Sequence, residues 1–299
     1  MDDLRRTLEG LLGSPDLEHR FASLETVSRD KRDDCEIHDL RFTTFDGEIA
    51  PAWYVFPTQV TGPVPAVLYL HAHGNRYDIG RQELFEGRPA LDGPYIDTLV
   101  GLGFAVLCIE MPCFGARQEP NESSRSKAHL WHGTTLFGRM LFELRCGLTF
   151  LGERPEIDKN RIATMGISMG GTQAYWLAAL DQRIAAAVSL CAFGDLQCLI
   201  KNGNHDKHGH YMSVPGLLKT TSTGKIAGLV APRPLFIGVG MKDWSSPPDC
   251  FSIARDETGQ IYAQIGAQNS FTIHIQPQAG HEETSSMRQA VEHFLRQLV

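Results

Sequence analysis

The stretch Gly166-Ile167-Ser168-Met169-Gly170-Gly171 decides the fold. It follows a short apolar segment, residues 161–165, that indicates a buried strand, and it precedes residues 172–180, which favour a helix. A strand, a sharp turn and a helix with serine at the apex form the G-x-S-x-G nucleophile elbow. Gly166 and Gly170 leave room where two backbone segments pass close together. The alternative is a glycine-rich turn with a solvent-facing serine, and the flanking segments argue against it.

Apolar runs alternate with helical patterns on both sides of this stretch. Such alternation is typical of an α/β fold with a doubly wound, mostly parallel sheet. An antiparallel hairpin is expected at one edge, because residues 36–45 and 48–60 favour strands and Asp46-Gly47 is a strong turn signal between them. Ligands of such sheets bind at the carboxyl ends of the strands. The further strands are expected at residues 65–70, 104–109, 184–190, 235–239 and 271–275, and helices at 94–101, 137–151 and 287–298.

The length of the chain and its first residues predict how it is organised. The chain has 299 residues, of which 42% are hydrophobic, and a chain of this size can bury about three-quarters of its unfolded surface. Residues 1–32 are charged and helical in pattern, with a break near Gly13. We expect them to form an N-terminal helical extension that acts as a lid or an oligomer contact. Residues 33–299 are expected to form a single domain.

Charge and cysteine content argue against several classes of protein. The net charge is −7 without a basic block, so neither nucleic acid nor an anionic membrane is an expected partner. No apolar run approaches the length of about 18 residues that a membrane helix needs, and the acidic N-terminus does not resemble a secretion signal. The 7 cysteines are scattered, which predicts free and mostly buried thiols. A cytoplasmic protein is therefore expected.

A nucleophilic serine needs a base, and the base needs an acid that orients it. In the elbow topology these partners follow in the order serine, acid, histidine. Asp243 comes after the strand at 235–239, and His281 comes after the last strand, which places both at the edge of the sheet that carries Ser168. Asp195 follows the preceding strand and competes with Asp243 for the role of the acid. We predict that Ser168, Asp243 and His281 act together. The alternative for His281 is that it is an ordinary histidine of a surface loop.

The loop His71-Ala72-His73-Gly74-Asn75 follows the first buried parallel strand. In the elbow topology this loop supplies one amide of the oxyanion hole, and the residue after the nucleophile supplies the other. We expect the donors to be the amides of Met169 and Asn75, with Gly74 as the next choice. A different hypothesis uses His71 and His73 as metal ligands, joined by the histidines at 205–210, for metal-dependent hydrolysis. That hypothesis leaves Ser168 and its partners unexplained, so we expect no metal.

The segment at residues 192–230 is too long for a simple crossover between two strands. Long loops in compact domains are usually functional, so this one is predicted to form a wall of the site. It contains several histidines and a tyrosine. The residues expected to bind substrate come from this loop and from the other strand ends, and they are His73, Gly74, Met111, His210, Tyr211 and Trp244.

These motifs together resemble the α/β-hydrolase superfamily, and within it the esterases similar to dienelactone hydrolase and acetyl xylan esterase. The similarity covers roughly residues 60–299 and rests on HAHGN at 71–75, ERPEIDKNRIATMGISMGG at 153–171, PGLLK at 215–219, APRPLFIGVGMKD at 231–243 and AGH at 279–281. Dienelactone hydrolases themselves carry a cysteine where this chain has Ser168, so their activity is not expected.

The resemblance implies a serine-dependent carboxylic ester hydrolase that works without a cofactor. Small acyl esters, such as acetyl esters, are the implied substrates, and whether the chain forms a homo-oligomer is left open. Thioester, lactone or peptide hydrolysis would use the same residues. A non-catalytic binding protein on the same scaffold is a further alternative, and the complete set of Ser168, Asp243 and His281 argues against it.

Overall fold

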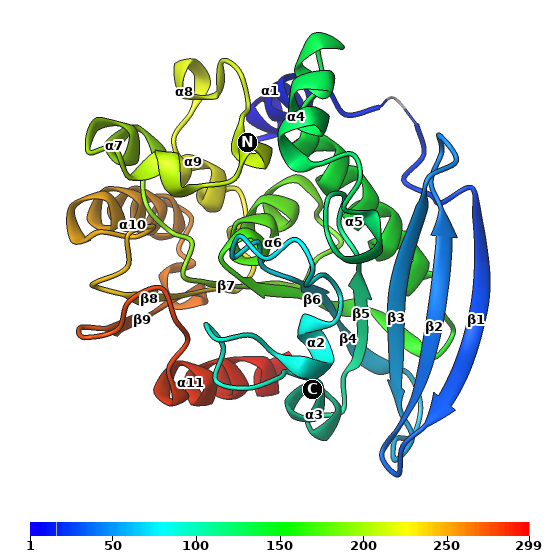
Figure 1. Cartoon of the computed structure of the whole chain (residues 1–299). Coiled ribbons are helices and arrows are strands. Elements are labelled where there is room, and N and C mark those ends of the chain that lie inside the picture. Colours follow the sequence, from blue (N-terminus) through cyan, green and yellow to red (C-terminus); the bar gives the residue numbers. More distant parts are fainter. Residues whose placement is uncertain (16, 299) are drawn as a thin grey trace.

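A computed structural model describes residues 1–15 and 17–298 of the chain. Its strands form one sheet in the order β1-β2-β3-β5-β4-β6-β7-β8-β9 (Figure 1). Strands β4 to β9 are parallel, while β1, β2 and β3 pair antiparallel and join the sheet at β5. The strands are β1 (Ser23–Lys31), β2 (Cys35–Thr43), β3 (Ile49–Pro57), β4 (Val64–Leu70), β5 (Ala105–Ile109), β6 (Ile157–Ile167), β7 (Ala186–Leu190), β8 (Leu235–Gly240) and β9 (Phe271–Gln276).

Helices cover both faces of the sheet (Figure 1). One core lies under α1 (Asp2–Leu12), α5 (Leu136–Gly152), α6 (Met169–Leu180), α9 (Thr223–Gly228) and α10 (Pro248–Gln264). The other lies under α2 (Glu83–Glu86), α3 (Ile96–Gly101) and α11 (Ser285–Leu295). The remaining helices are α4 (Glu122–Trp131), α7 (Leu196–Lys201) and α8 (Leu217–Thr220), with 3-10 turns η1 (Gly115–Arg117), η2 (Asn204–Lys207), η3 (His210–Met212), η4 (Gln268–Ser270) and η5 (Arg296–Leu298).

The parallel strands confirm the doubly wound α/β sheet expected from the sequence. Strand β4 is the clearest case, because all seven of its residues are buried. A strand buried on both faces needs an unbroken apolar run, and the sequence of β4 has one. The parallel strands place their carboxyl ends along one edge, where the elbow and the loops after β4, β8 and β9 meet.

The N-terminal region differs in part from the expectation of a helical extension over residues 1–32. Helix α1 is present and ends at Gly13, which adopts a left-handed conformation with φ 63°. Leu8 and Leu12 of α1 are fully buried, and Arg5 donates to the carbonyl oxygens of Ala179 and Leu229 at 2.7 and 2.8 Å. Residues 23–31, in contrast, form β1. Polar and charged residues at an exposed edge strand carry no apolar alternation, which is why the pattern looked helical.

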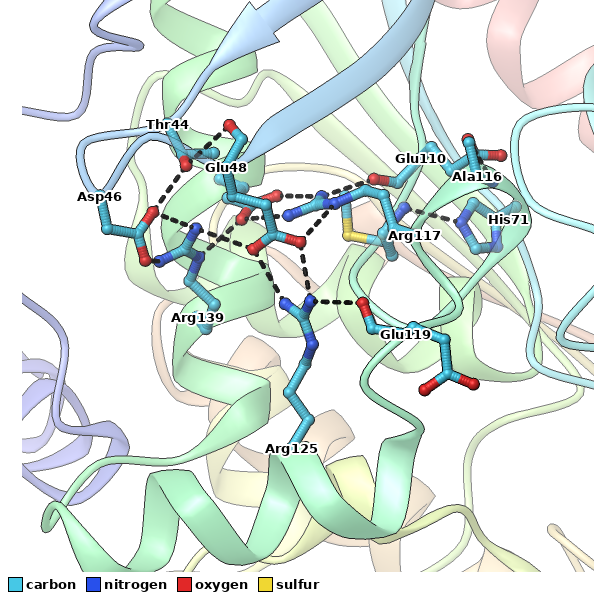
Figure 2. A network of polar contacts seen from close by, with 12 residues as sticks. Thr44, Asp46, Glu48, His71, Glu110, Ala116, Arg117, Glu119, Arg125 and Arg139 are labelled. Atoms are coloured by element: carbon cyan, nitrogen blue, oxygen red, sulfur yellow. Dashed lines mark hydrogen bonds and ion pairs between the residues drawn. The ribbon is translucent and has the colours of Figure 1, made fainter.

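The expected hairpin of β2 and β3 is present, but β1 and not β2 is the edge strand. The sheet therefore continues across the domain boundary expected at residue 32. A network of polar contacts ties the turn of this hairpin to α4 and α5 (Figure 2). Glu48 pairs with Arg117 and Arg125 at 3.1 and 2.8 Å, and Asp46 pairs with Arg139 at 2.7 Å.

The cysteines require a second correction. Five of them are free and buried as expected, at positions 35, 108, 113, 146 and 191. Cys198 of α7 and Cys250 of α10, however, form a disulfide. They lie 52 positions apart, so no local spacing such as C-x-x-C could have predicted the bond. Separately, none of the helices described is both long and apolar enough to cross a membrane.

Candidate active site

Ser168 occupies the sharp turn between β6 and α6. Its backbone has φ 58° and ψ −118°, a conformation that is rare for a residue with a side chain. A side chain at Gly166 or Gly170 would collide with the carbonyl oxygen of Leu70 in β4. The two glycines therefore let β6 and α6 approach β4 closely enough to hold the strained turn. The turn projects the serine hydroxyl beyond the carboxyl edge of the sheet.

His281 connects Ser168 to Asp243 through hydrogen bonds on both ring nitrogens. Its Nε2 lies 2.9 Å from the Ser168 Oγ, and its Nδ1 lies 2.9 Å from the Asp243 Oδ1. A carboxylate oxygen only accepts, so Nδ1 carries the hydrogen and Nε2 is left to accept the serine proton. Asp243 is buried, and the Ser245 amide donates to the same Oδ1 at 2.8 Å. The three side chains expected to act together lie in hydrogen-bond contact.

Asp195, the competing acid, has a different role in the structure. It is the N-cap of α7, and its Oδ1 accepts a hydrogen bond from the Cys198 amide at 2.9 Å. A capping side chain of this kind satisfies an otherwise unpaired amide of the first helical turn. No hydrogen bond joins Asp195 to His281 in the described chain. The geometry thus favours Asp243 as the partner of His281.

The two expected oxyanion donors differ in their present contacts. Met169 is the first residue of α6, where backbone amides have no partner within the helix, and no acceptor for its N–H is found among the described residues. The amide of Asn75 instead donates to the Nδ1 of His73 at 3.1 Å. The Asn75 amide is therefore engaged within its own loop, and its role as an oxyanion donor stays a prediction. Gly74, which lies between the two residues, has φ 55°, a left-handed conformation that lets the chain fold back so that the amide reaches the His73 ring.

Glu122 of α4 organises this loop, and the sequence analysis did not identify it. The Nε2 of His73 lies 3.2 Å from Glu122 Oε1, which also accepts the Tyr211 amide at 3.1 Å. The hydroxyl of Tyr77 donates to Oε2 at 2.8 Å. Burial alone would raise the pKa of Glu122. The hydrogen bonds, of which the one from His73 has the largest effect, outweigh burial and hold the pKa below its usual value. The only sequence signal was Asn121, a good helix cap, which marks α4 without indicating its contacts.

His71 is a buried structural residue. Its Nδ1 donates to the Ala72 carbonyl at 3.1 Å, and its Nε2 accepts the Met111 amide at 3.1 Å. Burial lowers the pKa of His71 to about 3, so its ring stays neutral near neutral pH. Both nitrogens of His73 are also occupied, by Asn75 and Glu122. These contacts leave neither ring a free lone pair for a metal. In the part of the chain that is described, the grouping close enough for metal binding is Cys198, Asp249 and Cys250, which includes the disulfide.

A cavity of about 200 Å³ opens beside Ser168. Four of the six residues expected to bind substrate line it, namely His73, Gly74, Tyr211 and Trp244. Met111 and His210 do not: Met111 is buried with 1% exposure, and His210 lines a neighbouring cavity. The wall expected from residues 192–230 is present, but Lys207, His208 and Gly209 form it together with Tyr211.

Trp244 lies beside the histidine of the site. The ring centroids of Trp244 and His281 are 5.0 Å apart, and the ring of His208 meets Trp244 edge-on at 5.0 Å. Such aromatic contacts restrict the rotation of the imidazole. Asp243 holds one ring nitrogen of His281, and Trp244 packs against the ring and further limits its orientation.

Comparisons with known proteins found one relative in sequence over almost the whole chain and several similar folds. No protein-family model matches the chain. The chain is 38% identical to YtaP of Bacillus subtilis (strain 168), a provisionally named hydrolase, over 98% of this chain and 97% of that protein. A provisionally assigned acetyl xylan esterase from Bacteroides fragilis NCTC 9343 has a TM-score of 0.78 at 18% identity, covering 100% of this chain and 87% of that one. A glucuronoyl esterase from Solibacter usitatus has a TM-score of 0.74 at 13% identity, covering 99% and 91%.

Proposed function

The chain belongs to the α/β-hydrolase superfamily, and we propose that it is a serine-dependent carboxylic ester hydrolase. The observation that carries the proposal is the pair of 2.9 Å hydrogen bonds that joins Ser168, His281 and Asp243. A serine hydroxyl is a poor nucleophile unless a neighbouring base takes its proton. Here the imidazole nitrogen that lacks a hydrogen is the one beside the serine.

In the proposed mechanism the Oγ of Ser168 attacks the ester carbonyl carbon while Nε2 of His281 takes the hydroxyl proton. Asp243 keeps the hydrogen on Nδ1 and stabilises the imidazolium that forms. The tetrahedral intermediate then collapses, and His281 gives the proton to the leaving alcohol oxygen. Water, activated by the same histidine, hydrolyses the acyl-enzyme and restores Ser168.

The negative oxygen of the intermediate needs hydrogen-bond donors that are already in place. The amide of Met169 supplies one. For the second we propose Asn75, whose amide would turn from His73 toward the substrate. A developing oxyanion is a stronger acceptor than a neutral imidazole nitrogen, which favours this exchange. The oxyanion hole would then be completed only when substrate is present.

The size of the cavity favours small acyl groups. A space of about 200 Å³ is below the range of about 300–1,000 Å³ that is usual for drug-sized ligands. Two of the similar folds are named as esterases, one provisionally as an acetyl xylan esterase and the other as a glucuronoyl esterase. We therefore propose acetyl and similarly short esters as the substrates, with thioesters as an alternative that uses the same residues.

The proposal is tested with a fluorophosphonate probe, a chelator and the variant Ser168→Ala. The wild-type protein should hydrolyse p-nitrophenyl acetate, and the probe should label Ser168 in a one-to-one ratio and stop turnover. Ser168→Ala should lose a factor on the order of 10⁶ in turnover while its melting temperature stays close to that of the wild type. Exhaustive chelation should leave the rate unchanged, because no step uses a Lewis acid. Resistance to the probe with loss of activity on chelation would instead support metal-dependent hydrolysis.

A further inference from the structure

His208 lines the candidate active-site cavity but has no role in the mechanism proposed above. It belongs to the long loop after β7, directly after η2, and its ring is half-buried. The ring is held edge-on against Trp244, with 5.0 Å between centroids, and Trp244 in turn lies against His281. His208 therefore occupies a fixed place on the side of the cavity where His281 stands.

The hydrogen bond made by His208 determines which ring nitrogen carries the hydrogen. Its Nδ1 lies 3.3 Å from the backbone carbonyl oxygen of His205. A carbonyl oxygen only accepts, so the hydrogen is on Nδ1 and Nε2 has a lone pair. Nε2 has no hydrogen-bond partner among the described residues. Unpaired atoms that are completely buried do not include it, so Nε2 has some surface exposed to solvent. It is an acceptor that remains accessible.

The ring keeps this neutral form near neutral pH. Burial lowers the pKa of His208, and this effect outweighs the hydrogen bond to the His205 carbonyl, which raises it; with the smaller lowering by His281 the pKa is about 4. A protonated His208 would present a donor at Nε2 and would repel the imidazolium that His281 forms during turnover. The neutral ring avoids both effects.

His281 donates a proton to the leaving oxygen, so the alcohol part of an ester must lie on the His281 side of Ser168. The wall on that side includes Trp244 and His208. A fixed acceptor at this position discriminates in favour of groups that can donate to it, because a group that cannot donate leaves the nitrogen desolvated and unpaired.

Resting on the ester-hydrolase function proposed above, we propose that His208 is a specificity residue that accepts a hydrogen bond from a free hydroxyl group on the alcohol part of the substrate. The chemical class is an ester of a diol or polyol in which a second hydroxyl stands near the ester oxygen. Esters of simple alkanols would bind without this contact.

The test compares kcat/KM for two small esters that differ in one donor, 2-hydroxyethyl acetate and 2-methoxyethyl acetate. Each is measured with the wild type, with His208→Phe, with His208→Gln and with His205→Ala. His205→Ala is the matched control, because the hydrogen bond to the ring is made by the backbone carbonyl of His205, which the substitution keeps. Dividing the substrate preference of the wild type by that of each variant cancels the intrinsic reactivity and size of the two esters.

The preference for the hydroxyl ester should be about tenfold greater in the wild type than in His208→Phe. His208→Phe should lose that preference, since phenylalanine fills the site without an acceptor. His208→Gln should restore part of it, because its amide oxygen can accept, and His205→Ala should retain it. A His208→Phe variant whose preference equals that of the wild type overturns this proposal and leaves the ester-hydrolase function standing. If neither ester is hydrolysed and the fluorophosphonate does not label Ser168, both proposals fail.

Discussion

Ser168 has a strained backbone conformation that places its hydroxyl where it can react. A residue with a side chain at φ 58° costs on the order of 1–3 kcal/mol relative to an ordinary conformation. The buried end of β6, residues 162–167, and the fully buried helix α6 hold it there. In return the hydroxyl stands at the rim of the sheet, at hydrogen-bond distance from His281 and beside the amide of Met169. A relaxed turn would place the hydroxyl elsewhere.

The two aspartates near the site should respond differently to the same change. Asp243→Asn should keep the fold but present an amide nitrogen to His281, which favours the wrong imidazole tautomer, and should lower kcat by a factor of about 10⁴. Asp195→Asn should have little effect on kcat, because asparagine also caps helices well. Steady-state kinetics on p-nitrophenyl acetate and melting curves of both variants provide the check. A large loss of kcat in Asp195→Asn with a mild effect in Asp243→Asn would contradict this assignment.

At the residue scale, the sequence predicted the groups that follow strand ends. Ser168 comes directly after β6, and Asp243 and His281 lie in the loops that follow β8 and β9, so topology alone places them at one edge. Glu122 and His208 could not be found this way. Glu122 reaches the site from α4, and His208 acts through a tautomer that the carbonyl of His205 selects. Neither contact leaves a pattern in the sequence.

At the scale of elements, the antiparallel hairpin is fixed to the helices by buried charges rather than by apolar packing alone. Arg117 is 4% exposed and pairs with Glu48 from the hairpin (Figure 2). It also pairs with Glu143 from α5. The same arginine donates to the carbonyl of Glu110, in the loop that follows β5. The neighbouring Met111 amide is held by His71 at the site. The network thus fixes the loop after β5 relative to the loop after β4.

Glu48 should make the stability of the protein depend on pH in the acidic range. Burial alone would raise the pKa of Glu48, but Arg125 and Arg117 outweigh it and lower the pKa to about 2. An unfolded glutamate titrates near about 4.3. Since the folded state depresses the pKa, the contribution is complete above about pH 4.3 and is lost as the pH falls toward 2.

The variant Glu48→Gln should therefore unfold more easily at pH 7, by about 3 kcal/mol, and should lose less stability than the wild type between pH 5 and 3. Urea denaturation at several pH values measures both effects. Glu25→Gln, at an exposed position of β1, is the control and should behave like the wild type. Equal pH slopes for Glu48→Gln and the wild type would show that the ion pairs do not hold the carboxylate in its charged form.

Elements with strong periodicity were predictable, and those without it were not. The buried strand β4 and the amphipathic helix α5 have the expected bounds to within a few residues, because their apolar residues repeat with the period of the structure. Strand β1 and helix α4 were missed. All residues of β1 are exposed, and α4 has a polar sequence that buries Glu122 and Ser126 rather than apolar side chains. Tertiary contacts decide such segments.

At the scale of the whole molecule, two long-range attachments stabilise the helical layer beside the site. Helix α1 fixes the N-terminus to α6 and α9 through Arg5 and through the buried Leu8 and Leu12. On the other side, the disulfide between Cys198 and Cys250 joins α7 to α10. Helix α7 leads into the loop that carries His208, so the bond also restricts the start of the cavity wall.

The disulfide gives a prediction that bears on the compartment of the protein. Disulfides persist in oxidising environments and are rare in the cytosol, so this bond argues against the cytoplasmic location expected from the sequence. That location stays a prediction.

Thiol titration of the unfolded protein, purified without reductant, should find 5 free thiols, and 7 after reduction. Closing a loop across 52 positions stabilises the folded state by about 4 kcal/mol in the chain-entropy account. Reduction should then lower the melting temperature by about 6 °C.

The variant Cys198→Ser, which leaves Cys250 buried and free, separates the bond from the effect of the reductant on other groups. Its melting temperature should match that of the reduced wild type and should not change when reductant is added. Because the bond restrains α7 and not the elbow, labelling of Ser168 by the fluorophosphonate should survive in this variant. A count of 7 thiols before reduction, with no change in melting temperature on adding reductant, would show that the two cysteines are free in solution. In that case packing alone holds α7 against α10, and the free cysteines would favour the cytoplasmic location expected from the sequence.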